Sequence, residues 1–163
     1  MIWEDLNEDI IVFQSDASTS DEVFETLGKI LIDKGYCKDS YVQALKDREK
    51  EYPTGINVGG FGIAIPHTDP EHVIRETESI LTLKKPVRFT QMGSTDIPVD
   101  VKLVMMLTIK DPKAHIKKLQ RIITLVQDQQ LLKNIYDSDS ADRVIQLIKE
   151  KEDAIEKESE NLL

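Results

Sequence analysis

The run VDVKLVMML, residues 99–107, constrains the fold more than any other part of the chain. It is nearly continuous in apolar and β-branched residues, which is typical of a central strand that is buried on both faces. Shorter apolar runs in the middle of the sequence are flanked by helical patterns toward both ends. We therefore predict an α/β domain with a single mixed β-sheet sandwiched between helices.

Four shorter apolar runs predict the remaining strands: 10–13, 62–67, 79–85 and 86–89. Pro86 separates the last two, because proline has no N–H for a strand ladder. The run GIAIPH ends at Pro66 and His67, so that a histidine follows the strand directly. Four glycines in TGINVGGFG, residues 54–62, precede this strand and allow a sharp bend.

Helix-start signals flank the predicted strands. Thr19 and Glu22, and again Ser40 and Gln43, have the spacing of a capping box. The second of these helices is expected to end before Pro53 and to carry Arg48 near its C-terminal end. Both helices precede the glycine-rich stretch.

Asp111 and Pro112 predict the start of a later helix, with His115 in its first turn. Its expected buried stripe is Ile116, Leu119, Ile123 and Val126. Short helices are expected near 131–135 and from 140 to about 149. We assign residues 1–150 to one domain and residues 151–163 to a charged helical extension or frayed tail.

Composition excludes several classes of partner. The formal net charge of −9 disfavours nucleic acid and anionic membranes. No apolar run approaches the roughly 20 residues that span a bilayer, and the acidic N-terminal segment does not resemble a secretory signal. The single Cys37 fits a reducing compartment. We expect a cytoplasmic protein without direct membrane insertion.

The three histidines are the candidates for chemistry. His67 stands on a rigid strand end, which suits a reactive group presented to large partners, although such a histidine is commonly a turn residue. His115 lies where a helix N-terminus favours anions, but it also borders the buried face, so a structural role stays open. His72 is five residues from His67 with a proline between them, which favours a solvated loop over a metal site.

Motifs for nucleotide binding or for a catalytic triad are missing. There is no Walker A sequence, no dinucleotide GxGxxG, no GxSxG elbow and no cysteine nucleophile with a plausible base. We expect no cofactor and no metal.

The stretch DREKEYPTGINVGGFGIAIPHTDPEH, residues 47–72, resembles the active-site region of the fructose/mannitol-type enzyme IIA family of the sugar phosphotransferase system (PTS). An arginine in an RE-containing helix end, a hydroxyl residue and an apolar strand ending in PH occur in order. DPKAHIKKLQRI matches the later helix histidine of the family, and the resemblance extends over residues 10–150. PHTDPEHV, with Thr68 and Asp69 after the histidine, looks closest to the galactitol-type branch.

This resemblance implies a phosphotransferase that accepts phosphate from phospho-HPr on His67 and passes it to a cysteine of the cognate enzyme IIB, serving the membrane component IIC only indirectly. It implies that His115 orients or stabilises the phosphoryl group and that Arg48 offsets its charge. Thr54 is expected to donate a hydrogen bond to the phosphate or the histidine. The substrate implied is galactitol or a related polyol.

Two other functions stay open. A nitrogen-type IIA relative would share the fold and the phosphohistidine but act by phosphorylation-dependent binding to other proteins. A scaffold domain that only inherited the fold would not need Arg48, Thr54, His67 and His115 together. The sequence identifies neither the sugar nor the oligomeric state.

Overall fold

A five-stranded sheet lies at the centre of the computed structural model, which describes residues 1–162. The strand order is β1-β4-β5-β3-β2. The pairs β1–β4 and β3–β5 are parallel, whereas β4–β5 and β2–β3 are antiparallel. The predicted mixed sheet is therefore confirmed, and the strands are β1 Ile11–Ser15, β2 Gly55–Val58, β3 Phe61–Ala64, β4 Thr77–Thr90 and β5 Pro98–Thr108.

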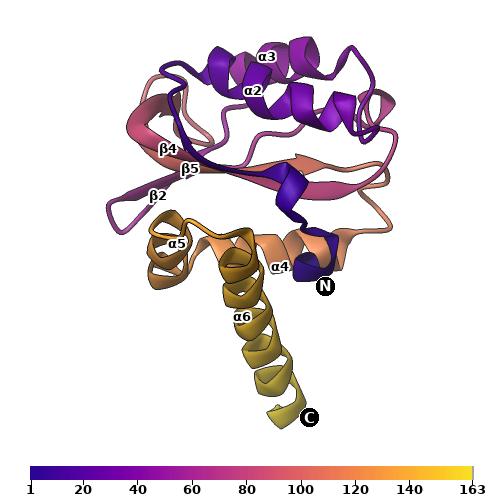
Figure 1. Ribbon diagram of the computed structural model, residues 1–163, viewed down its shortest axis with the longest axis vertical. Coiled ribbons are helices and arrows are strands. Elements are labelled where there is room, and N and C mark those ends of the chain that lie inside the picture. Colours follow the sequence, from indigo (N-terminus) through magenta and orange to yellow (C-terminus); the bar gives the residue numbers. More distant parts are fainter. Residues whose placement is uncertain (163) are drawn as a thin grey trace.

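Helices cover both faces of the sheet, as Figure 1 shows. Two of them, α2 (Ser20–Asp33) and α3 (Tyr41–Glu51), lie on one face, and α4, α5 and α6 lie on the other. The central strand β5 is buried from Leu103 to Thr108 because its side chains contribute to a separate apolar core on each side. The other helical elements are α1 Ile2–Asp5, η1 Glu8–Ile10, η2 Pro70–His72, α4 Ile116–Val126, α5 Gln129–Tyr136 and α6 Ala141–Asn161.

The two strands predicted around Pro86 are one continuous strand, so that prediction was wrong. The register between β4 and β5 shifts between Thr82 and Val87, and residues 84–86 are exposed. A proline is tolerated at such an irregularity because the ladder needs no N–H from it there. A prediction from Pro86 alone could not distinguish a strand break from a bulge.

The two predicted capping boxes had different outcomes. Thr19 caps α2, because its hydroxyl accepts the backbone N–H of Glu22 at 3.1 Å. Ser40 makes no such bond at the start of α3; its hydroxyl is hydrogen-bonded to Nδ1 of His72 at 2.8 Å. A partner distant in sequence therefore replaced the local cap.

The helix predicted to open at Asp111 begins five residues later, at Ile116. The carboxylate of Asp111 accepts the N–H groups of Lys113 and Ala114, at 3.1 and 3.2 Å, and so closes a turn before the helix. His115 is consequently the N-cap residue of α4 and not a member of its first turn.

The buried stripe predicted for this helix was right for Val126, which is buried, and for Leu119, which packs partly buried against the core, but wrong for Ile116 and Ile123. Ile116 and Ile123 are 55% and 49% exposed, and the residues of α4 that face the core are Ile122, Leu125 and Val126. The buried face of α4 therefore includes Ile122 and Leu125, which the prediction left out.

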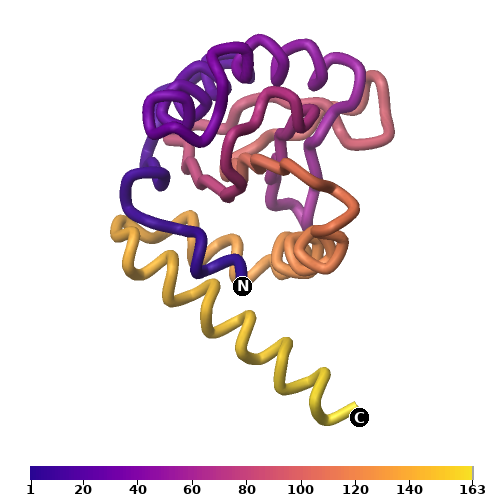
Figure 2. Tube along the Cα trace, turned by 90° about the vertical axis from the view of Figure 1, so that its right-hand side faces the viewer, coloured from indigo at the N-terminus to yellow at the C-terminus, as the bar shows by residue number. Residues whose placement is uncertain are grey.

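The C-terminal helix α6 projects away from the sheet, as Figures 1 and 2 show. It continues without a break from Ala141 to Asn161. Its Glu152 has no exposed surface and accepts the backbone N–H groups of Ile2 and Trp3, at 3.1 and 2.8 Å. Residues 151–161 of the expected tail belong to this helix, and Leu163 lies outside the described residues.

Candidate functional site

Strand β3 fixes the position of His67. The β2–β3 hairpin turns at Gly59 and Gly60, whose φ angles of 57° and 95° favour glycine. Strand β3 then runs beside β5 so closely that a Cβ on Gly62 would lie 2.0 Å from the carbonyl oxygen of Asp100. After the strand ends at Ala64, the carbonyl of Pro66 accepts the N–H of Leu107 at 2.9 Å. The segment before His67 is thus attached to the central strand.

The ring of His67 is half-buried and held in one tautomer. Its Nδ1 lies 2.9 Å from the carbonyl oxygen of Ile65. A carbonyl only accepts, so Nδ1 carries the proton and Nε2 carries the lone pair of the neutral ring. Burial lowers the pKa of His67; the bond to Ile65 and the charge of Asp69 oppose this change, and the charge of Arg48 adds to it. The site therefore presents a neutral imidazole with Nε2 available as a nucleophile.

Arg48 lies beside the loop that follows His67. Its Nη1 is 3.0 Å from Oδ1 of Asp69, and its guanidinium lies 5.0 Å from the centre of the Tyr52 ring. Its buried Nε has no hydrogen-bond partner among the described residues. Together with Thr68 and His72, these residues line a cleft of about 410 Å³ between α3 and the loop. The structure therefore places the guanidinium of Arg48 against Asp69, two residues after the histidine, with its Nε donor unused.

Thr54 is buried, and its hydroxyl is already engaged. Both its N–H and its hydroxyl donate to the carboxylate of Glu49, at 2.9 Å. Burial raises the pKa of Glu49, and the bonds from Thr54 oppose that rise. The carbonyl of Thr54 accepts the N–H of Ile65 at 3.2 Å. In this arrangement Thr54 ties the end of α3 to the histidine strand, and its contact with a phosphate stays a prediction.

His115 is engaged by a residue that the sequence analysis missed. Its Nε2 lies 3.0 Å from Oε2 of Glu76, whose Oε1 accepts the N–H groups of Lys110 and Asp111. No hydrogen bond joins His115 to His67 within residues 1–162, although both follow strands at the same end of the sheet. The sequence feature that could have identified Glu76 is an acidic residue directly before β4, opposite the end of β5.

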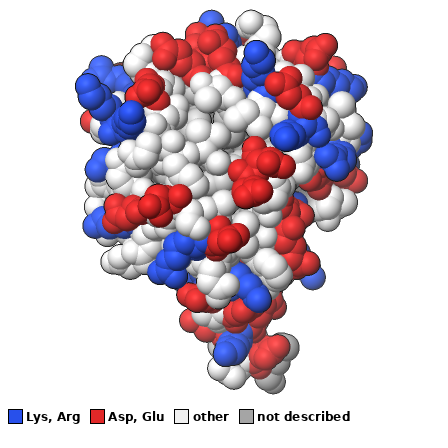
Figure 3. Space-filling view, viewed as in Figure 1, with Lys and Arg blue, Asp and Glu red and all other residues white. Residues whose placement is uncertain are grey.

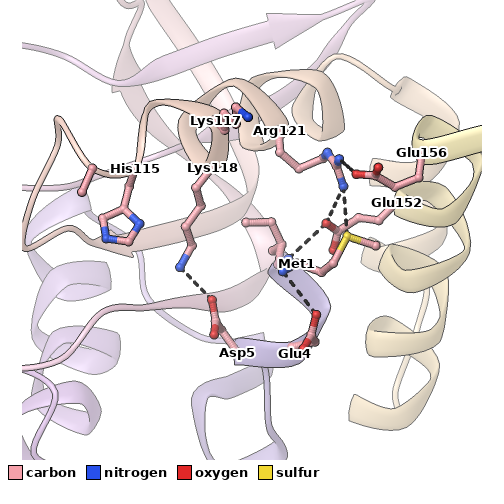
Figure 4. A pocket seen from close by; sticks show the side chains of 11 residues that line it. Met1, Glu4, Asp5, His115, Lys117, Lys118, Arg121, Glu152 and Glu156 are labelled. Atoms are coloured by element: carbon pink, nitrogen blue, oxygen red, sulfur yellow. Dashed lines mark hydrogen bonds and ion pairs between the residues drawn. The ribbon is translucent and has the colours of Figure 1, made fainter. Parts of the chain in front are cut away.

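A second cavity, of about 530 Å³, opens beside His115 between α1, α4 and α6. Figure 4 shows the basic side chains of α4 reaching across it toward acidic ones. Lys118 pairs with Asp5 at 2.7 Å, and Arg121 pairs with Glu152 at 2.8 Å. These cations are therefore neutralised by nearby carboxylates, and the cavity offers no excess of positive charge at these two positions.

His72, the third histidine, stands apart from this chemistry. Its Nδ1 is bonded to Ser40, and its Nε2 lies 3.6 Å from the carboxylate of Glu71. The described residues contain no group of three or more His, Cys, Asp or Glu side chains that could hold a metal ion. His72 links η2 to the start of α3.

The surface charges and the helix lengths bear on which partners the protein can bind. On the face shown in Figure 3, uncharged side chains fill a central area and acidic and basic groups are mixed around it. This face therefore has no continuous basic patch of the kind that binds a phosphate backbone. None of the helices within residues 1–162 is both long and apolar enough to span a membrane.

Comparison with known proteins gives one consistent family. The model of the family described as "Phosphoenolpyruvate-dependent sugar phosphotransferase system, EIIA 2" matches residues 4–151. The galactitol-specific EIIA component of Escherichia coli K12 is 32% identical over 114 residues, covering 70% of this chain and 75% of that protein. The mannitol-specific IIA component of Staphylococcus aureus N315 is 31% identical over 144 residues, covering 88% and 94%.

Solved structures agree with this result. The mannitol enzyme IIA of E. coli, solved in complex with phosphorylated enzyme IIB, is 25% identical with a TM-score of 0.72, covering 88% of this chain and 96% of that one. The nitrogen regulatory protein IIA-Ntr of Neisseria meningitidis has the same TM-score at 23% identity, covering 90% and 98%, and shares the fold.

Proposed function

Because the chain belongs to the EIIA type 2 family of the phosphoenolpyruvate-dependent sugar phosphotransferase system, we propose that it carries a phosphoryl group on Nε2 of His67. The family resemblance stated from residues 47–72 is confirmed, and the protein is a phosphotransferase component. Beyond the family, we propose the route of the phosphate and the identity of the sugar.

The observation that carries the proposal is the hydrogen bond from Nδ1 of His67 to the carbonyl of Ile65. It fixes the ring, places the proton on Nδ1 and leaves the lone pair of Nε2 for attack. Since burial lowers the pKa of His67, the ring is neutral at pH 7 and needs no general base. A turn histidine without such a partner would rotate and would present either nitrogen.

Two in-line displacements complete the reaction. In the first, Nε2 of His67 attacks the phosphorus of phospho-HPr, the P–N bond to the donor imidazole breaks, and its electron pair returns to the donor ring. In the second, the thiolate of the enzyme IIB cysteine attacks the phosphorus, and the electron pair of the P–Nε2 bond returns to His67. The neutral ring, still bonded through Nδ1, is then restored.

The proposed supporting roles come from the family resemblance. Arg48 offsets the charge of the phosphoryl group, for which its planar guanidinium is suited. His115, at the N-cap of α4, stabilises or orients the phosphoryl group after leaving Glu76 or through its other ring nitrogen. Thr54 holds the loop and is the proposed source of a further hydrogen bond.

We assign the phosphoryl group to a polyol transport route, with galactitol or a related polyol as the substrate. The sequence PHTDPEH and the galactitol-specific relative support galactitol, whereas the mannitol-specific relative matches a longer part of the chain. The proposal places the protein in the cytoplasm with phospho-HPr as donor and the cognate enzyme IIB as acceptor. Residues 1–150 are the proposed carrier domain, and 151–163 its extension. No observation at the site favours the regulatory function.

The test is a reconstituted relay with phosphoenolpyruvate, enzyme I, HPr and purified enzyme IIB proteins of the galactitol and mannitol types. We expect phosphate to reach the cysteine of the galactitol-type IIB only when this protein is present, and 15N–31P NMR at alkaline pH to place the intermediate on Nε2 of His67. The matched control is His72→Gln, which changes a neighbouring histidine of the same loop and should leave transfer intact.

Phosphate on Nδ1 would contradict the role of the Ile65 bond. Faster transfer to the mannitol-type IIB would reassign the sugar. Phosphorylation without transfer to either IIB, together with phosphate-dependent capture of a kinase or potassium transporter, would replace the transport function by the regulatory one.

A further inference from the structure

Asp69 is the residue that holds Arg48 in the protein without phosphate. The two side chains form an ion pair with 3.0 Å between Nη1 and Oδ1. Asp69 follows His67 by two residues, and its side chain is 62% exposed, whereas that of Arg48 is 31% exposed. The ion pair therefore joins a sheltered cation to a carboxylate that water can easily solvate.

The hydrogen-bonding capacity of Arg48 is not used up by this pair. A guanidinium has five N–H donors in a fixed plane. The buried Nε of Arg48 has no acceptor within residues 1–162, and the ring of Tyr52 lies 5.0 Å away. The guanidinium therefore has donors that Asp69 does not use, and a group with several acceptor oxygens can engage more of them than one carboxylate oxygen does.

We propose that Asp69 is a positioning residue that keeps Arg48 beside His67 in the resting protein and releases it to the phosphoryl group once His67 is phosphorylated. The inference rests on the proposed function of His67.

The exchange is favourable on physical grounds. A phosphoryl group carries up to two negative charges and three acceptor oxygens, against one charge on a carboxylate, and it matches the planar fork of arginine. An exposed ion pair such as Arg48–Asp69 is weak and is lost at low cost. The released carboxylate of Asp69 then lies near the phosphoryl group and repels it, which favours onward transfer.

Asp69 therefore has two opposite effects on the reaction cycle. It positions Arg48 before phosphorylation, and it destabilises the phosphorylated form by competing for Arg48 and by its own charge. A residue with a purely structural role would give no such gain of phosphorylation on its removal. This difference in sign makes the proposal testable.

The first test is the equilibrium of phosphate between HPr and this protein, measured by intact mass spectrometry at alkaline pH. Asp69→Asn should shift the equilibrium toward the phosphorylated form by roughly fivefold, the scale of one exposed ion pair with its repulsion of the phosphoryl group. Asp69→Glu keeps the charge and should stay near the wild type. The matched control is Asp47→Asn, which lines the same cleft but accepts from Gln43.

The second test needs no phosphate donor. Two charges that act on His67 are those of Arg48 from α3 and Asp69 from its own loop. In Arg48→Gln, where no guanidinium can be released, adding Asp69→Asn should lower the pKa of the His67 ring in an NMR titration, because the carboxylate that favours the imidazolium is gone. With Arg48 present, Asp69→Asn should lower that pKa less, because the guanidinium that Asp69 held near the ring is also released. Asp47→Asn should leave the titration of His67 unchanged.

The outcomes separate this inference from the proposed function. If the wild type accepts phosphate but Asp69→Asn leaves its equilibrium unchanged or lowers it, the inference is overturned and the carrier function stands. If Asp69→Asn lowers the pKa of His67 equally with and without Arg48, Asp69 does not hold Arg48 beside the ring and the inference also fails. If the wild type accepts no phosphate, the proposed carrier function is refuted, and the proposed release of Arg48 is refuted with it.

Discussion

Replacing Glu152 by glutamine tests how the C-terminal helix is attached to the body of the protein. The carboxylate of Glu152 is fully buried and accepts three N–H groups, from the backbone of Ile2 and Trp3 and from Nη1 of Arg121. Removing one partner of a buried ion pair costs about 3–5 kcal/mol. Glutamine retains one acceptor oxygen, so we expect a loss near the lower limit, about 3 kcal/mol.

A loss of that size lowers the melting temperature by roughly 6–12 °C for a chain of this length. Differential scanning calorimetry and urea unfolding at pH 7 measure both quantities. The control is Glu156→Gln, which removes a carboxylate from the same helix and the same partner Arg121 but at a site that is 48% exposed. It should cost less than about 1 kcal/mol. Equal effects of the two substitutions, or a loss below about 1 kcal/mol for Glu152→Gln, would refute the reasoning.

Three further predictions concern pH and packing. Burial lowers the pKa of His67, so the unfolded chain binds a proton there before the folded chain does as the pH falls below about 6.5. The free energy of unfolding in urea should therefore be lower at pH 5.5 than at pH 7.5, and the difference should be smaller in His67→Gln. Burial raises the pKa of Glu78 to about 8 against the opposing charge of Lys118, so this group stabilises the fold fully below its ordinary value of 4.5 and loses that contribution as the pH rises toward 8. The stability of Glu78→Gln relative to the wild type should therefore increase between pH 5 and 8, and a constant difference would contradict the assignment. Gly62→Ala places a Cβ against the backbone of Asp100 and should destabilise the protein by at least about 2 kcal/mol in urea unfolding; a neutral effect would show that β3 can move away from β5.

The sequence alone was sufficient where local chemistry and burial agree. Residues 99–107 form the central strand because an apolar run without alternation can be satisfied only between two covered faces. Arg48 and His67 were placed at a helix end and a strand end from local residues, whereas their proposed roles came from the family resemblance. The structure brings them near each other through Asp69, a contact that the two local patterns did not predict.

The sequence was insufficient where a distant partner decides the local conformation. Asp111 has the features of an N-cap, but its loop is held by Glu76, 35 positions away, so α4 starts later. Ser40 similarly bonds to His72 instead of capping α3. Pro86 was interpreted as a strand break because the partner strand that accommodates the irregularity is not visible in a local pattern.

The most direct test of the central claim is to incubate the purified protein with phosphoenolpyruvate, enzyme I and HPr and to measure its intact mass at alkaline pH. His67→Gln and His115→Gln are measured in parallel, each checked for folding by circular dichroism. We predict one added phosphate on the wild type and on His115→Gln, and none on His67→Gln. A folded His67→Gln variant that still gains the phosphate would contradict the account.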